Sequence, residues 1–548
     1  MLALSVIDCK RAPATKATPR PTPNLLLITI DTLRADRVGG ALTPTIDDIG
    51  RAGTVFADAT AHVPLTLPSH TSILTGRYPT AHGVVDNAAY TLSADTPTLA
   101  TTLHASGYHT AAFVASYVLR GSTGLARGFD LYDDRFDLSG VGTPESIGAP
   151  RVPPPLERRA PEMARLASRW IASAPQPFFA WVHFYDPHAP YDPPPAFAAK
   201  FPGRPYDAEV AAADFGVSSL LASMPAATRA KTVIVVTGDH GESLGEHGES
   251  EHGMLLYDAT LHVPLVMQGP GVPSGRIVRE QARHVDIVPT ALKLAGVAAP
   301  TGLDGQPLFD GRPPQTSYAE SRFGALHFGW SAIHSVRDGE WKYIDGPSPE
   351  LYQLASDPRE LTNVAEGRAG TAAGLAKLLT ITASHDTKTA VHAPNADAAE
   401  RLRSLGYVTG AVDLTSRASV DSPKIDIARY ESYVKAFNDG LAKLQDGRAR
   451  EAETVFNTLA RSFPRAFEAH QYRARALVGL HRYRDALGEL DAAIALAPAE
   501  PTLYFDAAQT LAFAGDYDRA DARLREGMQL DPTSADAAIT RQRLERSR

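Results

Sequence analysis

Residues 25–31 form the run Leu25-Leu26-Leu27-Ile28-Thr29-Ile30-Asp31, which is almost entirely apolar and ends in an acidic residue. Such a run is typical of a β-strand in the middle of a sheet that helices cover on both faces. Thr43 and Pro44 then predict the N-cap and the first turn of a helix, and Gly53 predicts its end. A strand followed by a helix indicates the start of an α/β unit.

Three further apolar runs of strand length are separated by helix-length stretches. They are Phe178 to Phe184, Val233 to Val236 and Leu265 to Met267. This pattern predicts a layered α/β fold with helices on both faces of the sheet. Ligands of open α/β sheets bind beyond the carboxyl ends of the strands, and Asp31, Asp186 and Asp239 each closely follow such a run. We therefore expect these three carboxylates to converge on one crevice.

The composition predicts a soluble globular protein of at least two domains. The chain has 548 residues, of which 44% are hydrophobic and 21% charged, and this length exceeds what one hydrophobic core usually organises. No uninterrupted apolar run reaches about 18 residues, so a membrane-spanning helix is not expected. The formal net charge of -8 and the absence of a lysine or arginine run argue against nucleic acid as a partner.

The N-terminal residues do not determine in which cellular compartment the protein is found. Cys9 is the only cysteine, so a disulfide framework within the chain is excluded. Residues 1–23 predict either a disordered, proline-containing tail or a trimmed export signal in which Cys9 follows a poor lipoprotein box. The second alternative favours a periplasmic, secreted or lipid-anchored protein.

Two weakly structured stretches interrupt the chain. Between Asp137 and Pro161 the sequence is rich in glycine and proline and predicts a surface loop. Residues 408–428 predict a linker, because they separate the α/β region over residues 24–407 from a segment of different character over residues 429–548.

That C-terminal segment repeats with a period of 34 residues. The period is shared by Pro464, Pro498 and Pro532, and also by Ala452, Ala486 and Ala520. The pattern resembles tetratricopeptide repeats, in which each unit is a pair of antiparallel helices. The resemblance implies an all-α solenoid and a protein partner. The alternative is a helical bundle that shares the spacing by coincidence.

The run Val63-Pro64-Leu65-Thr66-Leu67-Pro68-Ser69-His70 lies just ahead of a short helix pattern that ends at Gly76. It resembles the nucleophile segment of the alkaline phosphatase and sulfatase superfamily. Sulfatases have there a cysteine or serine that is oxidised to formylglycine, whereas the superfamily's nucleotide pyrophosphatases and phosphodiesterases have an unmodified threonine. The resemblance implies that Thr66 is the nucleophile. It also implies an alkaline phosphatase-like catalytic domain over residues 24–407, with a smaller subdomain at about 310–407.

A divalent cation is expected because the negative oxygens of phosphate and sulfate esters repel a nucleophile, and a cation absorbs that charge. Asp31, Asp239 and His240 resemble the superfamily's metal ligands, and by the same resemblance Thr66 completes the site. The implied cofactor is one or two ions of zinc, manganese or calcium. The alternative is that Asp31 and Asp239 only cap helices that follow buried strands.

Three further segments add candidate site residues by resemblance. Asn87 matches an asparagine that donates to a substrate oxygen in nucleotide pyrophosphatases, and its alternative role is that of a turn residue. Asp186 and His188 lie in a segment that resembles the superfamily's histidine-bearing loop, where His188 is a catalytic candidate. With them, His252 would complete a second metal site or an anion-binding site.

Departures from the sulfatase pattern favour phosphate chemistry. His70 stands where sulfatases have arginine, and Thr32 replaces the second of their paired aspartates. The leading hypothesis is therefore a phosphatase or phosphodiesterase that hydrolyses small phosphate or phosphonate esters through Thr66. One alternative is a sulfuric ester hydrolase. The other is a non-catalytic docking protein that acts through its C-terminal repeats.

Overall fold

The computed structural model describes residues 22–87, 90–136, 157–311, 315–328, 330–383, 427–498 and 500–530, together with residues 537, 540, 541 and 544. The expected N-terminal tail over residues 1–21, most of the loop predicted between residues 137 and 161, and the linker up to residue 426 lie outside the described residues. Pro532, the last proline of the 34-residue period, also lies outside them.

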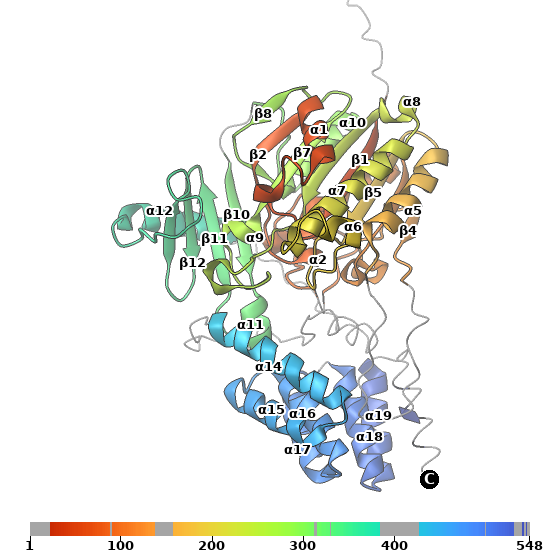
Figure 1. Cartoon of the computed structure of the whole chain (residues 1–548), viewed down its shortest axis with the longest axis vertical. Helices are drawn as coiled ribbons and strands as arrows, with labels where there is room; N and C mark the ends of the chain where they lie inside the picture. The colour runs from red at the N-terminus through yellow and green to blue at the C-terminus, as the bar shows by residue number, and fades with distance from the viewer. Residues whose placement is uncertain are drawn as a thin grey trace, which may run out of the picture.

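The larger sheet is mixed, and its described strands run in the order β4-β3-β5-β1-β6-β7-β2-β8, with β9 beside β2 (Figure 1). The strands are β1 (Asn24–Ile30), β2 (Thr54–Thr60), β3 (His109–Phe113), β4 (Leu131–Asp133), β5 (Phe178–Phe184), β6 (Thr232–Gly238), β7 (His262–Gln268), β8 (Arg276–Val278) and β9 (Ala282–Arg283). Strand β1 is central and runs parallel to both β5 and β6, while β7 is antiparallel to β6. The four strands predicted from apolar runs are thus confirmed.

Helices cover both faces of this sheet because successive side chains of β1 point to opposite sides. Leu25 and Leu27 pack into one hydrophobic cluster, and Leu26 and Ile28 pack into another. The first cluster includes residues of α2 (Thr66–Thr75), α4 (Leu99–Ala105) and α10 (Ile287–Ala295), and the second includes residues of α1 (Pro44–Ala52), α5 (Ala160–Ser173) and α7 (Pro205–Ser223). Short helices α3 (Pro79–His82), α6 (Pro195–Ala198), α8 (Ala226–Arg229) and α9 (Asp258–Leu261) lie in the connections. The predicted layered α/β fold is confirmed.

Helix α1 begins where the sequence predicts, with Thr43 at the N-cap position, but the Thr43 side chain makes no capping hydrogen bond. The Thr43 hydroxyl oxygen instead accepts a hydrogen bond of 2.7 Å from the Gly39 N–H. The cap comes from Asp214 on α7, whose carboxylate accepts from the N–H groups of Thr45 and Ile46 at 3.0 and 2.9 Å. A carboxylate at the N-terminus of a helix also complements the helix dipole. The Asp214 side chain therefore stabilises the start of α1 and connects α1 to α7.

A second, antiparallel sheet follows, with four strands among the described residues: β10 (Thr316–Ser321), β11 (Ile333–Asp338), β12 (Trp341–Asp345) and β13 (Glu350–Gln353). Helix α11 (Phe323–Phe328) connects β10 to β11, and residues of α12 (Ala369–Ala383) share a hydrophobic cluster with this sheet. These elements lie within the segment expected to form a smaller subdomain.

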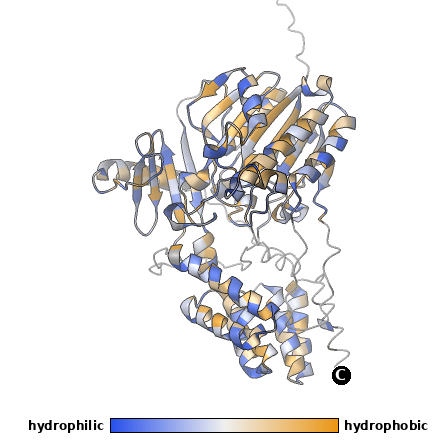
Figure 2. Cartoon of the chain, viewed as in Figure 1, coloured by the Kyte–Doolittle hydropathy of each residue, from blue (hydrophilic) through white to orange (hydrophobic). Residues whose placement is uncertain are grey.

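In the described part of the C-terminal segment, the long secondary-structure elements are all helices. They are α14 (Ile427–Gln445), α15 (Ala449–Ser462), α16 (Phe467–Gly479), α17 (Tyr483–Leu496), α18 (Pro501–Phe513) and α19 (Tyr517–Leu530). Helices α15, α17 and α19 begin 34 residues apart, and Ala452, Ala486 and Ala520 are fully buried at equivalent positions. Figure 2 shows hydrophilic and hydrophobic residues interspersed along these helices, whereas the strands of the larger sheet are mainly hydrophobic. None of the helices in the described ranges has the length and hydropathy needed to cross a membrane.

Gly238, the last residue of β6, provides a test of this packing. A Cβ atom there would lie 2.4 Å from the carbonyl oxygen of Leu33, a backbone atom that follows β1. We expect Gly238→Ala to lower the melting temperature by several degrees, since overpacking of this kind costs about 1–3 kcal/mol. Thermal unfolding followed by circular dichroism would measure the change.

Gly374→Ala is the matched control. Gly374 is exposed on α12, and a Cβ atom there would meet nothing within 4 Å. Because alanine favours a helix over glycine, this variant should melt at the wild-type temperature or slightly above it. Equal melting temperatures for the two variants would contradict the close approach of β6 to Leu33.

Candidate active site

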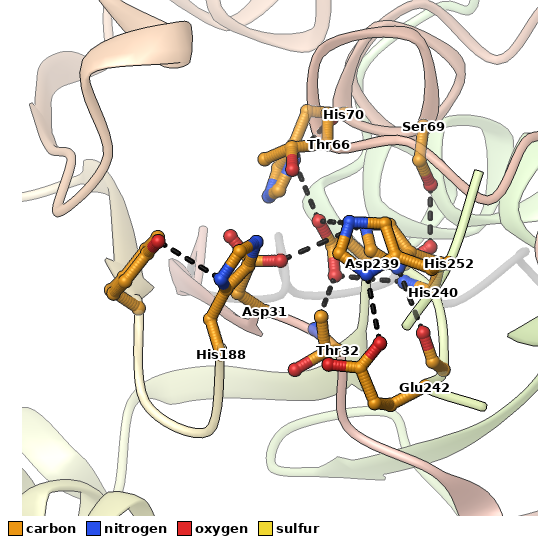
Figure 3. Close-up of polar contacts among 12 residues, drawn as sticks. Asp31, Thr32, Thr66, Ser69, His70, His188, Asp239, His240, Glu242 and His252 are labelled. Carbon is orange, nitrogen blue, oxygen red and sulfur yellow. Dashed lines mark hydrogen bonds and ion pairs between the residues drawn. The ribbon is translucent and has the colours of Figure 1, made fainter. Parts of the chain in front are cut away.

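The candidate site lies at the carboxyl ends of β1 and β6. These strands are parallel neighbours, so Asp31 and Asp239, which directly follow them, reach the same edge of the sheet. Both carboxylates are fully buried, and one ligand atom from each lies within 4.8 Å of the other and of a ring nitrogen of His240. Figure 3 shows the three side chains gathered at one point. This edge of the sheet therefore concentrates negative charge away from water.

Thr66 approaches this acidic pair from the opposite side to Glu242 (Figure 3). It is the first residue of α2, and Leu65 is the extended residue before the helix. The helix therefore begins inside the run that was expected to lie ahead of it, and Gly76 ends it as predicted. The Ser69 hydroxyl donates a hydrogen bond of 2.5 Å to the carbonyl oxygen of Asp239, which fixes the first turn of α2 beside the acidic pair. The Thr66 hydroxyl oxygen is buried and has no hydrogen-bond partner among the described residues.

Asn87 supports the same helix end. Its Oδ1 accepts a hydrogen bond of 2.8 Å from the Leu67 N–H, which would otherwise be an unsatisfied donor of the first turn. Its Nδ2 is buried and unpaired within the described ranges. Asn87 therefore presents a donor beside the N-terminus of α2, where backbone N–H groups and the helix dipole favour an anion.

Hydrogen bonds determine which atoms could hold a cation. Asp239 Oδ1 accepts from the N–H groups of Thr32 and His240 at 3.1 and 2.8 Å. Asp239 Oδ2 and both carboxylate oxygens of Asp31 have no hydrogen-bond partner in the described part of the chain. His240 Nδ1 lies 2.9 Å from the carbonyl oxygen of Gly241, which can only accept, so Nδ1 carries the hydrogen and Nε2 keeps its lone pair.

The separations of these atoms fit a divalent ion. His240 Nε2 lies 3.6 Å from Asp31 Oδ1 and 3.6 Å from Asp239 Oδ2. These distances are too long for hydrogen bonds, but they are close to the roughly 3.4 Å between two ligand atoms that each lie about 2.1 Å from one tetrahedral ion. Two carboxylates and one imidazole are also a donor set that zinc and manganese accept.

Electrostatics support the same conclusion. Burial raises the pKa of the Asp31 carboxyl, and burial together with the charge of Asp31 raises the pKa of Asp239 well above its usual range. Burial lowers the pKa of His240, so its ring is neutral, which is the form that binds metal. Two adjacent buried carboxylates repel each other unless a cation lies between them.

A second group with ligand-like spacing consists of His70, His183 and Asp239, but its hydrogen bonds exclude a metal. His70 Nδ1 lies 2.8 Å from the carbonyl oxygen of Thr66 and therefore carries a hydrogen. His183 Nδ1 accepts a hydrogen bond of 3.2 Å from the Ala115 N–H, so the hydrogen of this ring is on Nε2. His70 Nδ1 lies 3.5 Å from Asp239 Oδ2, and His183 Nε2 lies 3.5 Å from Asp31 Oδ2. Both nitrogens carry a hydrogen, so neither can ligate a cation.

Two more histidines line the site. His188 stacks on Tyr185 with ring centroids 4.6 Å apart, and burial lowers the pKa of His188 to about 4. His252 Nδ1 lies 2.9 Å from Glu242 Oε1, and its ring centroid lies 5.1 Å from that of His188 and 4.5 Å from that of His240. Burial opposes a charge on His252, but the Glu242 carboxylate outweighs it and raises the pKa of His252 to about 9.

Asp186 has a different role from the one expected. Its Oδ1 accepts a hydrogen bond of 3.0 Å from Arg159, and its Oδ2 accepts one of 3.0 Å from the Ala160 N–H at the start of α5. Arg159 also donates to Glu209 at 3.1 Å. Because an arginine and a helix N-terminus already occupy both carboxylate oxygens, we leave Asp186 out of the ligand set, although it follows β5 at the same edge.

Sequence reasoning missed three residues that the structure places around the site. Ser69 fixes α2, Glu242 orients His252, and His183 faces Asp31, with its Nε2 3.5 Å from Asp31 Oδ2. The signal for His183 is visible in the sequence, because it is the polar residue inside the apolar run of β5. A buried polar side chain in such a strand needs a hydrogen-bond partner.

Asp239→Asn tests the cation site. An asparagine can keep the oxygen that accepts from Thr32 and His240, but it replaces Oδ2 with an amide nitrogen that cannot ligate a cation. We expect a folded variant whose affinity for zinc or manganese is at least about tenfold lower. Metal analysis of the purified protein and the rise in melting temperature on adding metal would measure it.

Asp214→Asn is the control, since Asp214 is also buried and accepts from two backbone N–H groups, at the start of α1. That variant should lose stability without losing metal. If Asp239→Asn retained the metal content of the wild type, the cation site would be elsewhere.

Part of the chain is similar in sequence to known proteins. It is similar to arylsulfatase K of Homo sapiens, with 38% identity over 151 residues, and of Gallus gallus, with 36% identity over 165 residues. These matches cover 25% and 27% of this chain and 28% and 30% of the relatives. The matched part thus spans less than a third of the length of these relatives.

Solved structures resemble a larger part of the chain. A phosphonate monoester hydrolase of Agrobacterium radiobacter is 25% identical, with a TM-score of 0.54, and the match covers 68% of this chain and 97% of that one. A 2-O GAG sulfatase is 21% identical, with a TM-score of 0.53, and the match covers 72% of this chain and 98% of that one. The likeness to this sulfatase is one of fold.

The leading hypothesis of a phosphate or phosphonate ester hydrolase is wrong as the main assignment. The curated relatives are arylsulfatases, and their names favour the sulfuric ester hydrolase that the sequence had left as an alternative. The prediction of phosphate chemistry relied on single departures from the sulfatase pattern, at Thr66, His70 and Thr32. The likeness to sulfatases extends over the surrounding segments and outweighs these departures. The expected enzyme class, a hydrolase of ester bonds, agrees with the family model that the chain matches.

Two family models match the chain. One, described as N-sulphoglucosamine sulphohydrolase, C-terminal, matches residues 245–380. The other, described as Sulfatase, matches residues 23–297 and so encloses the site from Asp31 to His252. This chain is a member of the sulfatase family, within the alkaline phosphatase-like superfamily.

Proposed function

We propose that this protein is a sulfuric ester hydrolase that acts on sulfate esters of small molecules. The observation that carries the proposal is that the sulfatase match encloses a buried site with several unpaired polar atoms, three of which lie within 4.8 Å of one another. Among the described residues, these atoms belong to Asp31, Thr66, Asn87, Asp239 and His240. Such a set can accommodate both a cation and an anion.

Asp31, Asp239 and His240 would hold a divalent ion, with the Thr66 hydroxyl as a further ligand. When bound, the ion would neutralise charge on the sulfate and lower the pKa of the Thr66 hydroxyl. Zinc, manganese and calcium all fit the proposal, because the carboxylates are hard ligands and the imidazole is a borderline one. The family is metal-dependent, which agrees with this assignment.

Thr66 would be the nucleophile. Its oxygen forms a bond to sulfur while the bond from sulfur to the departing oxygen breaks, and its proton passes through His188 to that oxygen, so an alcohol leaves. Water then cleaves the sulfate ester on Thr66, which releases sulfate and restores the hydroxyl. The N-terminus of α2, the Asn87 amide and His252 would contact the sulfate oxygens through both steps, and their positions beside the acidic pair support this proposal.

The C-terminal segment, residues 429–548, is proposed to form tetratricopeptide repeats that the linker over residues 408–428 joins to a catalytic domain over residues 24–407. The shared 34-residue period of helix starts and buried alanines supports this assignment. Repeats of this kind bind protein partners on an extended surface, and we propose the same for this segment.

Aryl sulfates and matched aryl phosphates would test the proposal side by side. We expect the wild-type protein, loaded with manganese or zinc, to show the higher kcat/KM for the sulfate. Thr66→Ala should lower kcat by about 10³-fold or more, because it removes the group that forms the bond to sulfur. Release of the aryl alcohol, followed by absorbance, measures both.

Thr66→Ser is the conservative variant and should retain part of the activity, since the attacking hydroxyl remains. Mass spectrometry must show an unmodified serine at residue 66 for the comparison to hold. A higher kcat/KM for the phosphate, or an unchanged sulfatase rate in Thr66→Ala, would refute the corresponding part of the proposal.

A further inference from the structure

The C-terminal helical segment contacts the part of the chain that carries His252. We define the His252 loop as residues 243–253, between β6 and α9. Within it, the N–H of Ser243 donates to the carbonyl oxygen of Glu251 at 2.7 Å, and the N–H of Gly245 donates to that of Glu249 at 3.0 Å. The loop is therefore folded back on itself, with residues 245–249 at its tip.

Helix α14 holds this loop through one carboxylate. Glu431 accepts hydrogen bonds from both the N–H and the hydroxyl of Ser250, at 3.0 and 2.7 Å. One turn earlier on α14, Ile427 packs against the loop so closely that a Cβ atom on Gly248 would lie 3.2 Å from its side chain. Ser250 is two residues from His252, so α14 fixes the backbone just before this histidine.

The same helix also packs against α11. Tyr430 meets the rings of Phe323 and Phe328 edge to face at 5.8 and 5.6 Å, and Tyr433 meets Phe328 at 5.2 Å. Phe323, Phe328 and Tyr433 are buried members of one hydrophobic cluster that continues into the C-terminal helices. Helix α14 is thus anchored on the α/β part independently of Glu431.

Helix α11 in turn lies beside two segments of the site. Ser321, just before α11, donates its hydroxyl hydrogen to the carbonyl oxygen of Gly253, which directly follows His252. His327 on α11 lies 3.1 Å from the carboxylate of Asp86, the neighbour of Asn87. The backbone on both sides of His252 is therefore held, by α14 before it and by Ser321 after it.

We infer that α14 is a positioning element of the active site, which holds the His252 loop in place through Glu431. The C-terminal segment then contributes to turnover as well as to any partner binding, and a partner that displaced α14 would loosen His252. The kinetic consequence rests on the proposed sulfatase function, whereas the contact itself does not.

Glu431→Ala in the full-length chain tests the contact directly. Amide hydrogen exchange in peptides covering residues 245–253 should become about tenfold faster, because the Ser250 N–H loses its acceptor. With an aryl sulfate, kcat should fall about three- to tenfold while KM changes less than twofold, since a hydrogen bond to a charged group is lost outside the substrate contacts. Glu431→Gln keeps one acceptor oxygen and should give intermediate values.

Two further variants separate positioning from a loss of stability. Asp439→Ala removes an exposed carboxylate on α14 whose described ion pair is with Lys443 one turn along the helix, and it should change neither exchange nor kcat. Ser250→Ala should slow turnover, and combining it with Glu431→Ala should add little to the effect of Glu431→Ala alone, because Glu431→Ala already removes the hydrogen bond that Ser250→Ala deletes.

Unchanged exchange over residues 245–253 in Glu431→Ala would overturn the inference, whatever ester the protein hydrolyses. Faster exchange with an unchanged kcat would overturn the positioning role. If the wild-type protein hydrolysed no sulfate ester, the proposed function would fail, while the exchange experiment would still decide whether α14 holds the loop.

Discussion

The structure depends on the burial of two carboxylates side by side at the ends of adjacent parallel strands. Removing a carboxylate from water is unfavourable unless donors or a cation replace the water. On Asp239 the replacement is divided, since one oxygen accepts two backbone N–H groups and the other is left for a cation. One of those donors is the N–H of Thr32, which adopts a left-handed backbone conformation with φ of 52°. A non-glycine residue pays for this conformation with about 1 kcal/mol or more, and the hydrogen bond to Asp239 explains why it is retained here.

The histidines around this acidic pair differ in the group that contacts Nδ1 of the ring. A carbonyl oxygen takes the Nδ1 hydrogen of His240, so that its Nε2 can ligate, whereas a backbone N–H occupies Nδ1 of His183 and makes its Nε2 a donor. A carboxylate holds His252. The neighbouring groups thus set the tautomer and charge of each ring, so three residues of the same type differ in which nitrogen can donate or accept.

Much of this arrangement could be predicted from the sequence, because buried strands have a strong local signal. The runs that became β1, β5, β6 and β7 were recognised from hydrophobicity, and the rule that parallel strands end at one edge placed Asp31 beside Asp239. Interactions between distant segments had no such signal. The side chain of Asp214, not that of Thr43, caps α1, and Arg159, just before α5, pairs with Asp186. The choice of phosphate esters as the main substrate class was wrong for a related reason, since single substitutions near Thr66 were given more weight than the extended likeness to sulfatases around them.

The order of the strands in space has a consequence for how the protein is made. Residue 25 of β1 pairs with residue 179 of β5 and residue 233 of β6. The central strand is therefore synthesised long before either of the two strands that pair with it. Contacts of such long sequence separation form slowly, and the incomplete chain exposes an apolar strand with unpaired edges in the interval. A nascent chain shorter than about 240 residues therefore lacks β6 and Asp239, so one edge of β1 stays unpaired until that segment has been made.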